Sequence, residues 1–109
     1  MNLLNYQDKS QETAIYPGQG QNAGLAYAAL GLVGESGEVA NKVKKVLRGD
    51  VRTLDCRGAI ADEIGDILWY CAALATELGL DLDDIAQNNL DKLTDRQRRG
   101  TIQGDGDKR

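Results

Sequence analysis

Apolar residues recur every three or four positions along most of the chain, with polar residues between them. This spacing places the apolar side chains on one face of an α-helix. It predicts helices over about residues 4–15, 22–48, 54–78 and 82–99. The breaks between them are predicted at Tyr16-Pro17-Gly18, Gly49-Asp50 and Gly79, and Asp81 is a good N-cap for the last helix. No segment has the alternation typical of a strand, so the pattern predicts an all-α fold.

The chain has 109 residues, 41% of them apolar, which predicts a single domain over residues 1–109 with a real core. Its tail, 100–109, has three glycines and no apolar period, so we expect it to be irregular. Cys56 and Cys71 lie too far apart for a C-x-x-C pair, and no signal peptide or membrane-spanning run is visible. We therefore expect a cytoplasmic protein with reduced thiols.

Histidine is absent, which excludes Ser-His-Asp and Cys-His nucleophiles and His-ligated zinc. If the chain is an enzyme, carboxylates must carry the chemistry. A net charge of −4 argues against general binding of nucleic acid. Basic residues nevertheless gather near the C-terminus, where they could meet an anion: Lys92, Arg96, Arg98, Arg99, Lys108 and Arg109.

Two acid pairs occupy matching places in the two long helices. Glu35 and Glu38 lie beside the apolar face of the first long helix, and Glu63 and Asp66 lie on the same side of the second. Residues three apart project from successive turns about 5 to 6 Å apart, and a short connection predicts antiparallel packing, so the four carboxylates can converge. Acids that converge repel each other unless a cation lies among them, and Mg²⁺ suits an all-oxygen site. The alternative is that these are ordinary charges on solvated helix faces.

Glycine within each pair is the second shared feature. Gly37 and Gly65 lie on the helix side away from the acids, where a missing side chain would let another backbone approach closely. Such packing would fix the direction of the acids.

The acid pairs lie in "ESGE" at 35–38 and "EIGD" at 63–66, and three longer stretches accompany them: "TAIYP" at 13–17, "LGLVGESGE" at 30–38 and "NLDKLTDRQRRGTIQGDGDKR" at 89–109. In these stretches the chain resembles the MazG-like all-α nucleoside triphosphate pyrophosphohydrolases, relatives of the dimeric dUTPases and the dCTPases. This resemblance implies a four-to-five-helix bundle whose subunits associate through the long helices. It also implies that the four acids bind Mg²⁺, with Mn²⁺ as an alternative, and that the enzyme cleaves a triphosphate between its α and β phosphates.

Hydrolysis of a triphosphate needs metal ions and a carboxylate that accepts a proton from water. Glu38 is our candidate for that base. The resemblance assigns a phosphate contact to Tyr70, although a half-buried core tyrosine is the alternative. It assigns β- and γ-phosphate contacts to Asn89, Lys92 and Arg96, for which a solvated basic face is the alternative. We expect Lys42 to form a salt bridge with one of the acids. For the tail, one expectation is that Gly104, Gly106 and Arg109 fold over the bound nucleotide, and the alternative is a frayed terminus.

We expect the base of the nucleotide to lie near the first helix and the loop at residues 19–22. Trp69 falls on the outer face of its helix. Its side chain is therefore expected either to contact a partner protein or to pack under a local side chain or loop. The family resemblance favours a homo-oligomer, either a dimer or a tetramer of two dimers, and we expect the tetramer. Two other functions stay open: a catalytically silent nucleotide-binding or regulatory module, and a plain helical assembly protein.

Overall fold

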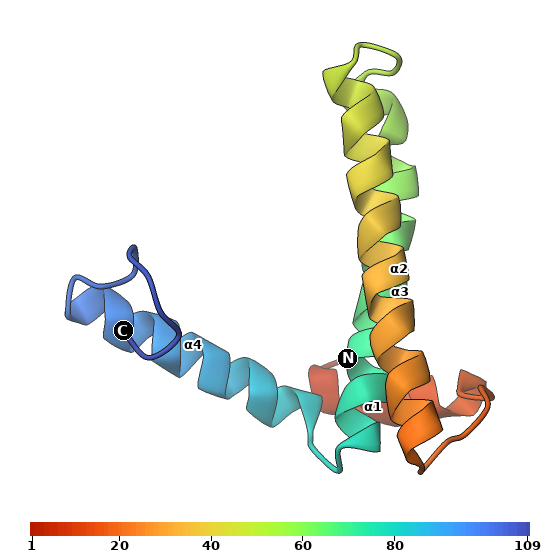
Figure 1. Cartoon of the computed structure of the whole chain (residues 1–109), viewed down its shortest axis with the longest axis vertical. Helices are drawn as coiled ribbons and strands as arrows, with labels where there is room; N and C mark the ends of the chain where they lie inside the picture. The colour runs from red at the N-terminus through yellow and green to blue at the C-terminus, as the bar shows by residue number, and fades with distance from the viewer.

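The computed structural model describes all 109 residues and contains only helices (Figure 1). In chain order they are α1 (Leu3–Ser10), the 3₁₀-helix η1 (Gln11–Thr13), α2 (Asn22–Leu47), α3 (Thr53–Glu77) and α4 (Leu82–Arg98). The predicted all-α fold is confirmed, and the last three helices begin and end within one residue of the predicted positions. The first predicted helix instead ends at Ser10 and tightens into η1.

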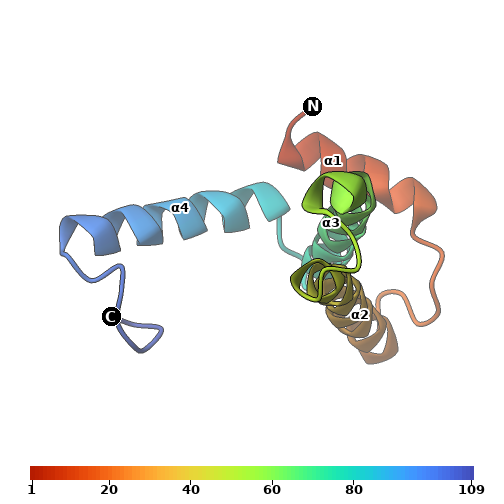
Figure 2. The same cartoon turned by 90° about the horizontal axis from the view of Figure 1, so that it is seen from above.

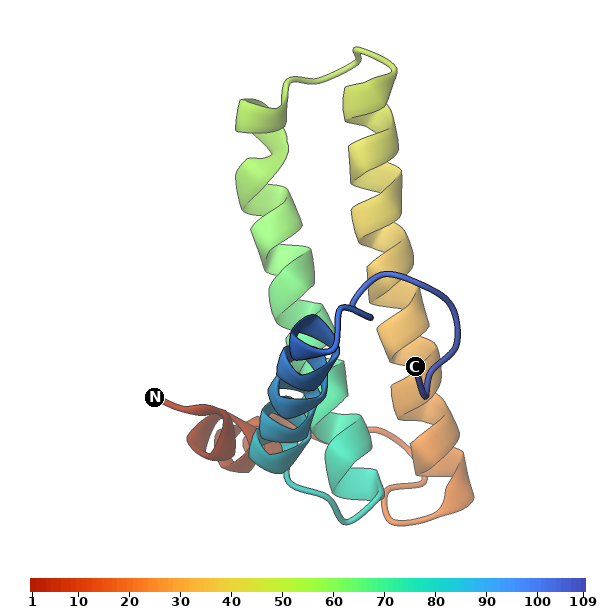
Figure 3. The same cartoon turned by 90° about the vertical axis from the view of Figure 1, so that its left-hand side faces the viewer.

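Glycine ends three of the helices in the same way. Gly49, Gly79 and Gly100 have φ values of 83°, 68° and 70°, in the left-handed region that only glycine enters without strain. The residue after each glycine donates its N–H to a carbonyl five positions back in the helix, which satisfies an otherwise unpaired group. The first of these turns sends α3 back along α2, so the two long helices form an antiparallel hairpin (Figures 1 and 3).

Helix α1 crosses the hairpin near the end where α3 leads into α4 (Figures 1 and 3). Gln7 attaches it there, because its Nε2 donates to Leu80 O at 2.9 Å and to Thr76 Oγ1 at 3.0 Å, and its Oε1 accepts from Leu82 N at 2.7 Å. A small core lies beside this buried amide. It consists of Ala72, Ala75 and Leu82, covered by Leu3, Tyr6, Leu68 and Cys71.

Helix α4 leaves this core at Leu82 and extends away from the hairpin (Figures 1 and 2). The single chain is therefore open, and its Cα radius of gyration is 16.6 Å against about 13 Å for a compact domain of this length. Large apolar side chains remain exposed along the hairpin, among them Leu30, Val33, Leu47 and Leu54. None of the helices is both long enough and apolar enough to span a bilayer.

Candidate metal and nucleotide site

Three of the four predicted acids meet across the hairpin. Glu35 of α2 and Glu63 and Asp66 of α3 each place one carboxylate oxygen within 4.8 Å of the other two. The second oxygen of Glu63, Oε2, is buried and has no hydrogen-bond partner. A buried, unpaired carboxylate oxygen is costly, and a cation is the partner that would satisfy it.

Glu38 does not join this cluster. Its side chain is 56% exposed, and its Oε2 lies 3.8 Å from the Nζ of Lys42, one turn further along α2. Lys42 also donates to Glu63 Oε1 at 3.0 Å, so the predicted salt bridge from Lys42 to a site acid is confirmed. The ammonium group therefore links Glu38 to the cluster and supplies part of the positive charge that the acids need.

Glu35 and Glu63 titrate in opposite directions. The neighbouring carboxyl group of Glu63 raises the pKa of Glu35, and partial burial and the charges of Asp66 and Glu38 raise it further. The neighbouring carboxyl group of Glu35 and the ammonium group of Lys42 lower the pKa of Glu63. Of these two acids, Glu35 is therefore the one that holds a proton more readily.

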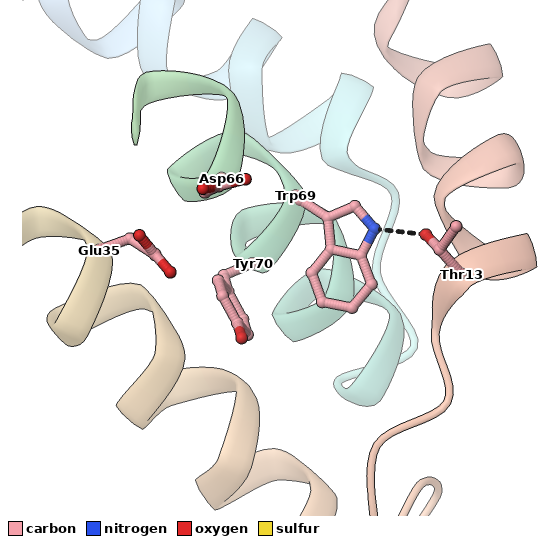
Figure 4. Close-up of a pocket in the computed structure, with 5 residues that line it drawn as sticks. All are labelled: Thr13, Glu35, Asp66, Trp69 and Tyr70. Carbon is pink, nitrogen blue, oxygen red and sulfur yellow. Dashed lines mark hydrogen bonds between the residues drawn. The ribbon is translucent and has the colours of Figure 1, made fainter. Parts of the chain in front are cut away.

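A pocket of about 320 Å³ opens beside the acids. Figure 4 shows Glu35 and Asp66 on one side of it, Tyr70 in the middle and Trp69 toward α1. This acidic pocket is lined by Thr13, Glu35, Asp66, Trp69 and Tyr70. Burial raises the pKa of Tyr70, with contributions from Tyr27, Glu35 and Asp66, so its hydroxyl remains protonated and able to donate.

Gly31 makes room for the Tyr70 ring. A Cβ at Gly31 would overlap the Cε1, Cζ and Cδ1 atoms of that ring. By contrast, a Cβ at Gly37 or Gly65 would meet no atom within 4 Å. The prediction that Gly37 and Gly65 permit close backbone packing is therefore wrong, because both glycines face open space. Sequence reasoning missed Gly31, which stands one helical turn before Glu35.

Trp69 packs under a local segment, which was one of its two predicted environments. Its Nε1 donates to Thr13 Oγ1 at 2.8 Å. Its ring meets Tyr16 edge to face at 6.3 Å between centroids and Tyr70 at 5.1 Å. No spacing pattern marked Thr13 or Tyr16 as neighbours of the acids, because the contact joins residues more than fifty positions apart.

The predicted phosphate contacts on α4 lie elsewhere in the single chain. Asn89 and Lys92 are exposed on the helix that extends away from the hairpin, and none of the α4 residues lines the acidic pocket. Arg96 is buried, and its Nη2 donates to the carbonyl of Asp107 in the tail. The structure thus groups Tyr70 with the acids and leaves the three α4 residues apart from them.

The tail is irregular, as predicted, but it folds onto the end of α4 and does not cover the acidic pocket. The Arg109 guanidinium donates to the carbonyls of Thr101, Ile102 and Gly106 at 3.1, 2.9 and 2.7 Å. Gly104 and Gly106 supply the positive φ values that the turn requires. The predicted contact of Gly104, Gly106 and Arg109 with nucleotide is thus not formed within this chain.

Comparison with known proteins bears on the family of the chain. The family model described as the MazG nucleotide pyrophosphohydrolase domain matches residues 25–101, which contain all four acids. The chain is also 50% identical over 109 residues to the Gene 37 protein of Mycobacterium phage L5, an alignment that covers 95% of this chain and 96% of that protein. No solved structure matches the chain. The chain belongs to the MazG nucleotide pyrophosphohydrolase domain family.

Proposed function

We propose that the protein is a Mg²⁺-dependent hydrolase that converts nucleoside or deoxynucleoside triphosphates to the monophosphate and pyrophosphate. The observation that carries the proposal is the meeting of Glu35, Glu63 and Asp66 within 4.8 Å, with Glu63 Oε2 buried and unpaired. An all-carboxylate donor set suits Mg²⁺, and Mn²⁺ accepts the same ligands. We expect the enzyme to clean or regulate a cytoplasmic nucleotide pool.

The acids have different roles in this proposal. Glu35, Glu63 and Asp66 would hold the metal, and Glu38 would join them by turning away from Lys42. Bound Mg²⁺ would neutralise phosphate charge and make water a better nucleophile. When it is not bound to the metal, Glu38 is the candidate to accept the water proton, because its side chain is exposed. The protonated hydroxyl of Tyr70 would donate to a phosphate oxygen at the edge of the pocket.

Assembly would bring the basic helix to the site. The exposed apolar hairpin and the extended α4 leave the single chain with a small core, which favours association with further copies. We expect a tetramer of two dimers, or a dimer, in which α4 carries Asn89, Lys92 and Arg96 to the acidic pocket of another copy. Light scattering after size-exclusion chromatography measures the assembly directly, and a monomeric active enzyme would contradict this arrangement.

The activity is tested with a panel of ordinary and modified nucleoside triphosphates incubated with Mg²⁺. Pyrophosphate and orthophosphate are both measured, because pyrophosphate with monophosphate identifies cleavage between the α and β phosphates. The variants Glu63→Gln and Glu38→Gln keep the side-chain shape and should lose activity while remaining folded. Asp62→Asn is the matched control, since Asp62 is exposed next to Glu63 but outside the cluster. Binding that needs Mg²⁺ without any turnover would instead indicate a silent nucleotide-binding module.

A further inference from the structure

Glu77, near the end of α3, holds the segment that connects η1 to α2. Its Oε1 accepts a hydrogen bond from the Tyr16 hydroxyl at 2.5 Å, and its Oε2 accepts from the Gly20 N–H at 3.0 Å. Gln19 Nε2 donates to Ala14 O at 2.7 Å and closes the same segment on itself. Burial and the bond to Glu77 raise the pKa of Tyr16 to about 12, so the hydroxyl donates throughout the neutral range. One carboxylate therefore fixes two points of this connection.

The anchored Tyr16 ring forms one wall of a second cavity. It stacks on Tyr27 with 5.1 Å between centroids and 4° between planes, and it meets Trp69 edge to face. This aromatic recess has a volume of about 140 Å³, and its lining residues are Thr13, Ile15, Tyr16, Tyr27, Trp69 and Tyr70. It shares three of them, Thr13, Trp69 and Tyr70, with the acidic pocket, so the two cavities adjoin.

The two cavities together match the two ends of a nucleotide. The acids at one end suit a metal and phosphates, whereas ring faces at the other end suit a planar base, which stacks on aromatic side chains. The Thr13 hydroxyl in the aromatic recess already accepts from Trp69 Nε1 and donates to Ser10 O at 3.1 Å, so it is not free to read the hydrogen-bonding edge of a base. Apolar contact discriminates far less among similar ligands than a site built on hydrogen bonds.

We infer that Glu77 is a positioning residue that holds Tyr16 in place so that the aromatic recess receives the base of the nucleotide. The inference rests on the proposed function of the acidic pocket for its substrate. Glu77 touches neither the acids nor the phosphates in this arrangement. It should therefore affect how tightly a base-bearing substrate binds and not the rate of the chemical step.

Four variants separate these effects. Tyr16→Ala removes the ring and should raise KM for nucleoside triphosphates by about 5- to 150-fold, which is the usual contribution of one stacked base. Glu77→Ala and Tyr16→Phe keep the ring but release it, and should raise KM by roughly 2- to 10-fold, with kcat changed less than about twofold. Glu12→Ala is the matched control, because Glu12 is an exposed acid in η1 whose side chain makes no hydrogen bond or ion pair.

Inorganic tripolyphosphate is the second probe, because it has the phosphates but no base. It should inhibit the wild type and Glu77→Ala equally. If its inhibition weakens in parallel with nucleotide binding, Glu77 acts on the acidic pocket or on the whole fold, and the inference is overturned. Unchanged KM in both Tyr16→Ala and Glu77→Ala, with an active wild type, overturns it as well.

Trp69 is the sole tryptophan, so its fluorescence reports the aromatic recess independently of turnover. Titration with an α,β-methylene triphosphate, which resists cleavage, should change the emission of the wild type, and the change should be weakened in Tyr16→Ala. If no triphosphate is hydrolysed but this change is present, the proposed function fails while the recess assignment stands. If hydrolysis occurs and the emission does not respond to any base, the recess assignment fails.

Discussion

Replacement of Gly31 by alanine tests whether the position of the Tyr70 ring depends on a missing side chain. The ring occupies the space that a Cβ at Gly31 would take, so the added methyl must push the ring aside. Gly37→Ala is the matched change in the same helix, because a methyl there meets nothing within 4 Å. The two variants differ only in what the new methyl touches.

The expected magnitudes follow from two opposing effects. Alanine is favoured over glycine in a helix interior by about 1 kcal/mol, a gain that both variants receive. Overpacking costs about 1–3 kcal/mol and applies to Gly31→Ala alone. Gly37→Ala should therefore be more stable than the wild type by ~0.5–1 kcal/mol, and Gly31→Ala should fall below Gly37→Ala by ~1–3 kcal/mol. For a chain of this size the second difference corresponds to roughly 4–12 °C in Tm.

Thermal unfolding followed by circular dichroism, at one fixed protein concentration, measures these differences. A double-mutant cycle with Tyr70→Ala gives the sharper test, because Gly31→Ala should cost nothing once the ring is gone. Equal stabilities of Gly31→Ala and Gly37→Ala, or the absence of coupling to Tyr70, would refute the reasoning. Where activity is present, Gly31→Ala should reduce it and Gly37→Ala should not.

Three further predictions concern the charged site and the core. Mg²⁺ at ten times its Kd should stabilise the folded protein by about 1.4 kcal/mol, and Glu63→Gln should abolish the resulting rise in Tm. Without divalent cations, the raised pKa of Glu35 stabilises the folded protein at low pH. This stabilisation is fully present below the pKa of Glu35 in the unfolded chain, and it is lost as the pH rises through the pKa in the folded protein. Glu35→Gln stays neutral, so it should flatten this part of a profile of Tm against pH measured in EDTA. Gln7→Ala removes three hydrogen bonds and leaves Leu82 N unpaired, so it should cost about 2–4 kcal/mol in urea unfolding.

The helices could be predicted from the sequence because their signals are local. A three-to-four-residue apolar period and a glycine just beyond each helix need no knowledge of the rest of the chain, and they located the ends of α2, α3 and α4 within one residue. The convergence of Glu35, Glu63 and Asp66 was predictable for the same reason. Helix periodicity fixes which side the acids occupy, and the short connection fixes the antiparallel direction.

The remaining features depend on packing between distant residues. Gly31, and not Gly37 or Gly65, is the glycine that close packing requires, because the Tyr70 ring lies against it. The position of that ring could not be predicted from the spacing of residues within α2. The anchoring of Tyr16 by Glu77 joins residues 61 positions apart. The direction of α4 likewise depends on one turn after Gly79 and on a small core at Leu82, so its separation from the hairpin could not be predicted from an amphipathic pattern.

Because of the charge of the site, metal binding should be accompanied by release of a proton. Glu35, Glu38, Glu63 and Asp66 could carry four negative charges, and Lys42 is the cation paired with two of them. The remaining repulsion helps to explain why Glu35 holds its proton more tightly than usual. A divalent cation that binds to ionised carboxylates must displace that proton and compete with Lys42 for Glu63. Calorimetry in buffers of different ionisation enthalpy should therefore detect proton release on Mg²⁺ binding, greatest near the raised pKa of Glu35 and absent in Glu35→Gln.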